Sequence, residues 1–239
     1  MRNILKKHLH DKPLYEALEH GFTSIEVDIL LVYGKLMVAH DLWKIKPEWT
    51  LQSLYLDPLQ DLVHLNEGSV YPDWPHSVIL LIDIKSEAEP TYELLREVLA
   101  EYEDMLSTFT PESTNRGAIT VIISGNRPKT VMENEDFRYA AMDGRLEDLK
   151  TDINPNLIPL ISDNWKKHFS WQGNGPMPEE ERLKLREIVN SAHEQGVKIR
   201  FWATPDGPDV WEELLAADVD LINTDDLGGL QKFLMEHCF

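Results

Sequence analysis

Short apolar runs alternate with amphipathic helical segments along this chain. Residues 78–86 (Val-Ile-Leu-Leu-Ile-Asp-Ile-Lys-Ser) are apolar until the end of the run, which is typical of a parallel strand buried on both faces. Residues 118–124 have the same character. Because parallel strands need a crossover between them, usually a helix, this alternation predicts an α/β protein built on a parallel sheet or barrel.

Seven such strands can be placed, and the polar residues at their ends favour a barrel. In (β/α)₈ barrels the site is built from the carboxyl ends of several strands. The seven strands contain Glu26, Asp83, Ser124, Tyr139, Leu160, Phe201 and Ile222. An eighth strand should precede the helix that begins at Pro13, where the available apolar pair is Ile4-Leu5. We therefore predict a TIM-type (β/α)₈ barrel whose first strand is missing or altered.

The length suits one barrel. Barrels of this kind occupy about 250 residues as one domain, so we predict a single domain over residues 1–239. No apolar run approaches the roughly 20 residues that span a bilayer, and no secretory signal is recognisable. The single cysteine, Cys238, cannot form an internal disulfide. We expect a cytoplasmic protein without stable membrane insertion, unless a signal peptide has been removed.

The chain carries a large excess of acidic residues. It has 23 Lys and Arg against 42 Asp and Glu, which gives a formal net charge of -19. Nucleic acids and anionic membranes are bound by clustered cations. The composition therefore argues against both as partners and favours a small-molecule substrate.

Two carboxylates interrupt the apolar strand at residues 24–30 (Ser-Ile-Glu-Val-Asp-Ile-Leu). Because strand side chains alternate between faces, Glu26 and Asp28 point to one side of the sheet and Val27 to the other. Two unpaired buried carboxylates are costly, since each resists ionisation in the field of the other. Such a pair usually has a divalent cation or a basic group between its members, and we predict a metal site.

Asp83 and Lys85 place an acid and a base on one face at the end of another core strand. His40 ends a second extended segment, residues 35–40, which a turn at Tyr33-Gly34 would connect to the acidic strand. Lys85 would steady a phosphate oxygen, and His40 would act as a general acid or base near neutral pH. The alternative for Lys85 is that it only neutralises Asp83 inside the barrel.

Two strand ends would then supply three carboxylates, from Glu26, Asp28 and Asp83. Hard cations prefer carboxylate oxygens as ligands. The expected cofactor is therefore a divalent cation, Mg²⁺ or Ca²⁺.

Five motifs occur in order along the chain. They are Glu26-Val27-Asp28, Ala39-His40-Asp41, Ile82-Asp83-Ile84-Lys85, Phe201-Trp202-Ala203-Thr204 and Ile222-Asn223-Thr224-Asp225. As an ordered set they resemble the PLC-like phosphodiesterase superfamily, which includes glycerophosphodiester phosphodiesterases and phosphatidylinositol phospholipases C. The resemblance covers nearly the whole chain from Pro13, although none of the motifs is specific alone.

The resemblance implies metal-dependent cleavage of a phosphodiester. Glu26 and Asp28 would be metal ligands, and Asp83 would stand in the place of the third acidic ligand. His40 would be one of two catalytic histidines. One histidine would take the proton of the attacking hydroxyl or water, and the other would protonate the leaving alkoxide.

The resemblance also implies substrate-binding positions. Trp202 would form a wall of the pocket, and Asn223 or Asp225 would form part of its floor. The alternatives are that Trp202 packs in the core and that residues 223–226 cap the last helix.

The N-terminus departs from the family pattern. In the family, the first strand ends in a His-x-His-Asn-Asp-like motif that supplies the other catalytic histidine. Aligned without a gap, this chain has Asn3, Leu5, Lys6 and Lys7 at those positions. His8 and His10 lie several residues too close to Pro13, so we interpret them as part of a loop or helix start. A shortened or replaced N-terminus would explain both the missing motif and the missing strand.

Three functions are compatible with these observations. The first is a metal-dependent phosphoric diester hydrolase for a glycerophosphodiester or phosphoinositide-like substrate, weakened if neither His8 nor His10 replaces the missing histidine. The second is a catalytically inactive barrel that binds a metal or a phosphorylated ligand. The third is a metal-dependent sugar isomerase or aldolase, which the Asp83-x-Lys85 and Trp202 patterns disfavour.

Overall fold

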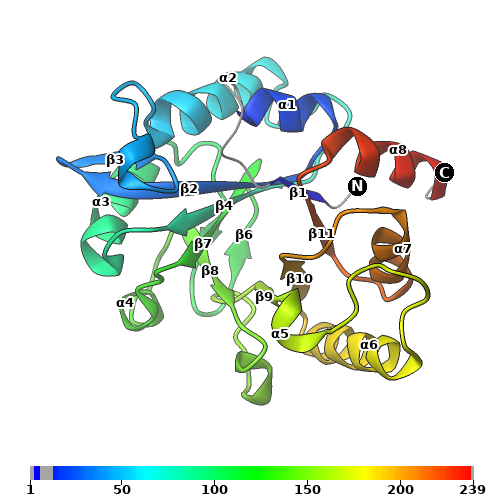
Figure 1. The fold of residues 1–239 in the computed structure, drawn as a ribbon. Coiled ribbons are helices and arrows are strands. Elements are labelled where there is room, and N and C mark those ends of the chain that lie inside the picture. The colour runs from blue at the N-terminus through cyan, green and yellow to red at the C-terminus, as the bar shows by residue number, and fades with distance from the viewer. Residues whose placement is uncertain (1–2, 6–12, 238–239) are drawn as a thin grey trace.

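The computed structural model describes residues 3–5 and 13–237. Its centre is a ring of parallel strands (Figure 1). The strands of the ring are β1 (Asn3–Leu5), β2 (Ser24–Val32), β4 (Val78–Ile84), β7 (Ile119–Gly125), β8 (Ala140–Gly144), β9 (Leu160–Asn164), β10 (Lys198–Trp202) and β11 (Leu221–Thr224). Neighbouring strands pair in parallel, and β1 pairs with both β11 and β2, which closes the ring. The predicted TIM-type barrel is confirmed.

Strand β1 supplies the eighth position of the barrel. Ile4 pairs with Asn223 on one side and with Ser24 on the other. The first strand is therefore not missing; it is present, with a length of only 3 residues. Three residues are too few to show the hydrophobic pattern by which a strand is recognised in a sequence.

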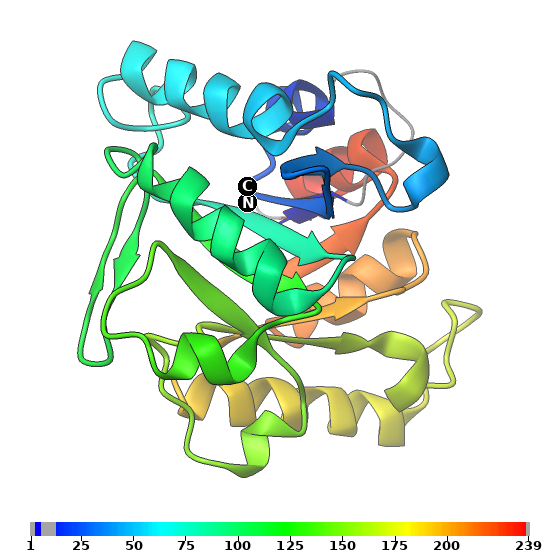
Figure 2. The same ribbon diagram turned by 90° about the vertical axis from the view of Figure 1, so that its left-hand side faces the viewer.

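Helices form the outer layer of the barrel (Figure 1). They are α1 (Pro13–Glu19), α2 (Asp57–Leu65), α3 (Ala88–Ala100), α4 (Lys129–Glu133), α5 (Trp165–His168), α6 (Glu179–Glu194), α7 (Pro208–Ala216) and α8 (Leu227–His237). The other helical segments are η1 (Leu42–Lys44), η2 (Gln52–Leu56), which leads into α2, and η3 (Asp148–Lys150). Figure 2 shows the sheet between α2 at the top and α6 at the bottom. Within the described ranges, no helix is long and apolar enough to cross a membrane.

Helix α6 shows how the sequence determines an element of this layer. Three glutamates occupy its first turn, where negative charge is favourable near the helix N-terminus. The chain leaves the helix through Gly196, whose φ of 73° favours glycine. Leu185, Val189 and Ala192 recur at helical spacing and are buried. These sequence signals predict a helix over residues 178–195, and the structure has it at Glu179–Glu194.

The predicted turn at Tyr33-Gly34 connects β2 to the antiparallel strand β3 (Lys35–Val38). Both turn residues have positive φ, 49° and 72°. After β3 the amide of Ala39 donates to the carbonyl oxygen of Asp28 at 3.2 Å. The hairpin therefore returns His40 to the acidic part of β2.

An apolar cluster fills the inside of the ring, where inward-facing side chains of several strands meet. Its members are Leu81, Phe109, Ile122, Ala141, Leu160 and Leu221. Phe109 comes from a small separate hairpin of β5 (Thr108–Phe109) and β6 (Thr114–Asn115). One pocket lies at the carboxyl ends of the barrel strands and another at their amino ends, so this cluster lies between two open mouths.

Candidate functional site

A pocket of about 520 Å³ opens at the carboxyl ends of the barrel strands. The predicted site residues that line it are Glu26, Asp28, His40, Asp83, Lys85 and Trp202. Asn223 and Asp225 are not among its lining residues. The barrel therefore brings together residues that are up to 176 positions apart in the sequence, from Glu26 to Trp202.

The three carboxylates meet because of the register between β2 and β4. Asp28 is the direct pairing partner of Asp83, and Glu26 lies two residues before Asp28 on the same face. One oxygen from each of the three carboxylates lies within 4.8 Å of the others. Glu26 and Asp28 are buried, so their charges are poorly screened by water.

The donor set fits a hard divalent cation. The Oδ1 atom of Asp83 is buried and has no hydrogen-bond partner among residues 3–5 and 13–237. A buried acceptor without a partner is uncommon in folded proteins, and a carboxylate oxygen is a preferred ligand of Mg²⁺ and Ca²⁺. Glu26, Asp28 and Asp83 are therefore the residues that would hold the ion.

Lys85 lies between two of the carboxylates. Its Nζ donates to Asp83 Oδ2 at 2.7 Å and lies 3.2 Å from Asp28 Oδ1. Burial acts to lower the pKa of Lys85, but the charges of Asp28 and Asp83 outweigh it, and the pKa is raised. Burial raises the pKa of the Asp83 carboxyl, which Lys85 partly opposes. Lys85 is therefore protonated at neutral pH, and it both pairs with Asp83 and lines the pocket.

Gly125 makes the close approach to Asp83 possible. Its φ is 67°, and a Cβ at this position would lie 1.9 Å from Asp83 Oδ1 and 2.5 Å from the carbonyl oxygen of Ile84. We predict that Gly125→Ala displaces the Asp83 carboxylate, weakens cation binding and lowers the free energy of unfolding by roughly 2–4 kcal/mol, because strain and overpacking add.

Gly34→Ala is the matched control for this prediction. Gly34 has a φ of 72° with nothing within 4 Å of the added Cβ, so it reports the backbone strain alone. Urea unfolding and titration with Mg²⁺ would compare the two variants. Equal losses of stability and unchanged cation affinity would contradict the role given to Gly125.

Arg200 is an inward-facing charge that the sequence analysis did not identify. Its guanidinium is buried, and Nη2 donates to Glu26 Oε2 and, at 2.9 Å, to Asn223 Oδ1. Asn223 therefore supports Arg200 in this structure. Strand alternation could have indicated Arg200, because it lies two residues before Trp202 and shares its face.

A third cation, Arg145, reaches the pocket from the segment that follows β8. Asp143 is fully buried, and its Oδ2 accepts hydrogen bonds from Ser124 Oγ and Ser162 Oγ, each at 2.6 Å, and from Arg145 Nη1 at 2.7 Å. This network holds the guanidinium of Arg145 at the pocket wall. Polar residues were expected at these strand ends, but no role was assigned to them.

His40 lies at the exposed edge of the pocket. Its Nδ1 is 3.1 Å from Asp41 Oδ2, and 47% of its side chain is exposed. The hydrogen bond from His40 is the main cause that lowers the pKa of Asp41, which Lys44 also contacts. A carboxylate on one ring nitrogen orients an imidazole for proton transfer.

Of the remaining predicted residues, one lies in the pocket wall and one lies outside the pocket. Trp202, the last residue of β10, is partly exposed in the pocket wall. Asp225 is exposed beyond β11, where its amide donates to Asp206 Oδ2 at 3.3 Å. His8 and His10 lie outside the described residues.

The fold is a ring of eight parallel strands with a polar pocket at their carboxyl ends. Solved structures of glycerophosphodiester phosphodiesterases have the same fold: one from Parabacteroides distasonis matches with a TM-score of 0.56 at 16% identity, covering 100% of this chain and 98% of that chain. One from Agrobacterium tumefaciens matches with a TM-score of 0.51 at 13% identity, covering 98% and 100%.

Comparison with protein families identifies the family to which the chain belongs. Residues 6–143 match the AIM6-like phosphodiesterase domain, and residues 198–228 match the glycerophosphoryl diester phosphodiesterase family. The chain belongs to the AIM6-like phosphodiesterase domain family.

Fungal relatives match along most of the chain. The altered inheritance of mitochondria protein 6 homolog of Arthroderma benhamiae is 27% identical over 91% of this chain and 76% of its own length. The altered inheritance of mitochondria protein 6 of Kluyveromyces lactis is 28% identical over 92% of this chain and 69% of its own length.

Proposed function

We propose that this protein is a divalent-cation-dependent phosphoric diester hydrolase that acts on a glycerophosphodiester or a phosphoinositide-like substrate. The observation that carries the proposal is the meeting of Glu26, Asp28, Asp83, Lys85 and His40 in one pocket at the carboxyl ends of the strands. In (β/α)₈ enzymes, that end of the barrel holds the site.

The chain's own residues bind and orient the phosphodiester. Lys85 and Arg145 line the pocket from different strands and would donate to the phosphoryl oxygens. An ion held by the three carboxylates would supply Lewis-acid stabilisation of the charge on those oxygens. The apolar face of Trp202 would pack against the alcohol part of the substrate.

His40 would move the proton of the nucleophile. A water molecule attacks phosphorus, and its proton passes to the imidazole of His40. The bond from phosphorus to the ester oxygen breaks, and the leaving alkoxide takes up a proton from solvent water. The contact with Asp41 would stabilise the imidazolium formed during the reaction.

We predict that His40→Ala lowers kcat/KM by about 10²–10⁴-fold, the usual contribution of a general acid or base. Release of p-nitrophenol from bis(p-nitrophenyl) phosphate and release of glycerol phosphate from glycerophosphocholine would be measured with added Mg²⁺ or Ca²⁺. His64→Ala is the matched control, because His64 is exposed on α2 and also pairs with an aspartate, Asp104. Loss of turnover in His10→Ala would identify the second histidine.

A barrel that binds a phosphorylated ligand without cleaving it is the second candidate. Among the described residues that line the pocket, His40 is the single histidine, and Glu26 is paired with Arg200. Saturable cation binding by the wild-type protein, without turnover of any of these phosphodiesters, would favour this candidate and contradict the hydrolase.

A further inference from the structure

A second and larger pocket lies at the other mouth of the barrel. It has a volume of about 940 Å³, within the range of small-molecule sites. Its lining includes Thr23, just before β2, Lys198, the first residue of β10, and Asp220, just before β11. This pocket is therefore at the amino ends of the strands, and the apolar cluster inside the ring lies between it and the candidate active site.

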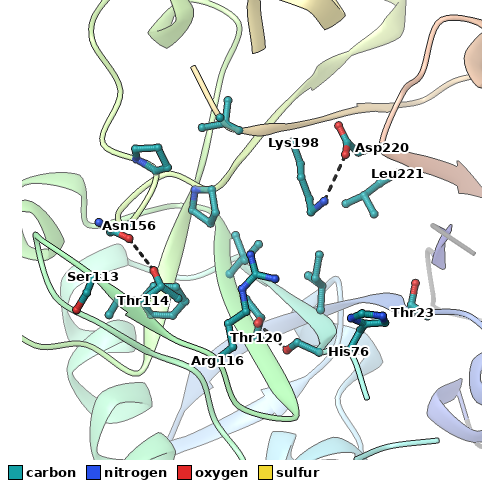
Figure 3. Close-up of a pocket in the computed structure, with 18 of the residues that line it drawn as sticks. Thr23, His76, Ser113, Thr114, Arg116, Thr120, Asn156, Lys198, Asp220 and Leu221 are labelled. Carbon is teal, nitrogen blue, oxygen red and sulfur yellow. Dashed lines mark hydrogen bonds and ion pairs between the residues drawn. The ribbon is translucent and has the colours of Figure 1, made fainter. Parts of the chain in front are cut away.

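The described residues that line this pocket include two cationic side chains, Arg116 and Lys198, and two carboxylates, Glu112 and Asp220. Figure 3 shows the guanidinium of Arg116 and the ammonium of Lys198 directed toward the interior of the pocket, with the ring of His76 at its edge. Arg116 forms no ion pair with any residue in the described part of the chain. Its side chain is exposed, so its charge is available to a ligand in the pocket.

Asp220, the buried carboxylate among the described residues of this lining, already has its partners. Asp220 accepts from His193 Nε2 at 2.8 Å, from the amide of Ile199 at 3.0 Å and from Lys198 Nζ at 3.3 Å. Its charge is therefore neutralised within the wall, and it does not cancel the charge of Arg116.

Trp74, which also lines this pocket, has a hydrogen-bond donor without an acceptor among the described residues. The indole Nε1 of Trp74 is buried and has no partner in the described ranges, and Trp74 lines the pocket beside His76, with ring centroids 4.7 Å apart. A buried donor without an acceptor is costly. An acceptor on a bound ligand would satisfy this donor, and an anionic oxygen would neutralise the charge of Arg116.

The floor of the pocket is apolar. Phe109 and Ile122 belong to the apolar cluster and form its base. Ser77 and Thr120 are joined by a hydrogen bond of 2.7 Å at its side. A ligand that fits both parts has an anionic group for the rim and an apolar part for the floor.

We propose that this pocket is a second binding site, separate from the active site, for a small molecule that carries a phosphate group. Arg116 and Lys198 would donate to the phosphate, whose three terminal oxygens can accept from several directions. The apolar part of the ligand would rest on Phe109 and Ile122. The site does not depend on the proposed hydrolase activity, because it shares no residue with the pocket at the carboxyl ends.

Isothermal titration calorimetry with inorganic phosphate tests this site. EDTA is present so that no divalent cation recruits phosphate to the acidic cluster, and ionic strength is held constant. Arg116→Gln should weaken phosphate binding by about tenfold or more, the value of a charge-assisted hydrogen bond, and Arg116→Lys should lose less. Arg186→Gln, an exposed arginine on α6, should bind as the wild type does.

Lys85→Met tests whether phosphate binds in the pocket at the carboxyl ends of the strands or in the pocket at their amino ends. It removes a cation from the carboxyl-end pocket and should leave phosphate binding under EDTA unchanged. The proposal is overturned if Arg116→Gln binds phosphate as well as the wild type, if Lys85→Met abolishes binding, or if the wild-type protein shows no saturable binding in the millimolar range. A weaker affinity for acetate than for phosphate is expected, and the reverse order would overturn the choice of phosphate.

Discussion

Replacing Asp83 by asparagine is expected to abolish hydrolysis and divalent-cation binding together. The amide keeps the shape of the side chain but removes the charge, so the buried Oδ1 position no longer offers an anionic ligand. We expect kcat/KM to fall by about 10³-fold or more, which corresponds to several kcal/mol of lost stabilisation. Turnover of bis(p-nitrophenyl) phosphate and calorimetric titration with Mg²⁺ and Ca²⁺ would measure the two effects.

Asp104→Asn is the matched control for Asp83→Asn. Asp104 is exposed, pairs with His64 on α2 and is not among the residues that line the pocket, so its variant should bind the cation and turn over substrate like the wild type. Cation affinity unchanged in Asp83→Asn would mean that Asp83 is not a ligand, whatever happens to turnover.

Arg200→Met is expected to lower the free energy of unfolding by about 3–5 kcal/mol in the absence of a divalent cation. The variant leaves Glu26 buried without its guanidinium partner, and breaking a buried ion pair on one side carries a cost of this size. Methionine keeps most of the volume, so a cavity contributes little. Added Mg²⁺ or Ca²⁺ should restore part of the loss, because Glu26 without its Arg200 partner would bind the cation more tightly than in the wild type, and tighter binding stabilises the folded state more.

Urea unfolding with and without the cation would measure this recovery. Arg186→Met on the exposed side of α6 is the control and should change stability by less than about 0.5 kcal/mol. If the loss in Arg200→Met were the same with saturating cation as without it, Glu26 would not be a cation ligand, and its role would be limited to pairing with Arg200.

Local sequence patterns were sufficient to predict the barrel and to predict that the acidic residues share one site. The uninterrupted apolar run of β4 indicated a strand buried on both faces, and strand alternation placed Asp83 and Lys85 on one face. The same rule placed Glu26 and Asp28 together on β2. These predictions succeed because a strand fixes side-chain direction with a period of two residues, whatever the rest of the fold does.

Contacts between distant strands could not be predicted in this way. The pairing of Arg200 with Glu26 joins residues that are 174 positions apart, and only the closed ring brings them together. The network around Asp143 likewise depends on which strands are neighbours. Strand β1 escaped recognition because its stability comes from two partner strands and not from a pattern of its own.

The short strand β1 has a consequence for the synthesis of this protein. One edge of β1 pairs with β2, which follows it closely, but the other edge pairs with β11, whose first residue is Leu221. Translation proceeds at about 5–20 residues per second, so this edge waits roughly 10–40 seconds for its partner to leave the ribosome. Unpaired strand edges template aggregation, and a strand of 3 residues exposes very few backbone groups during that interval.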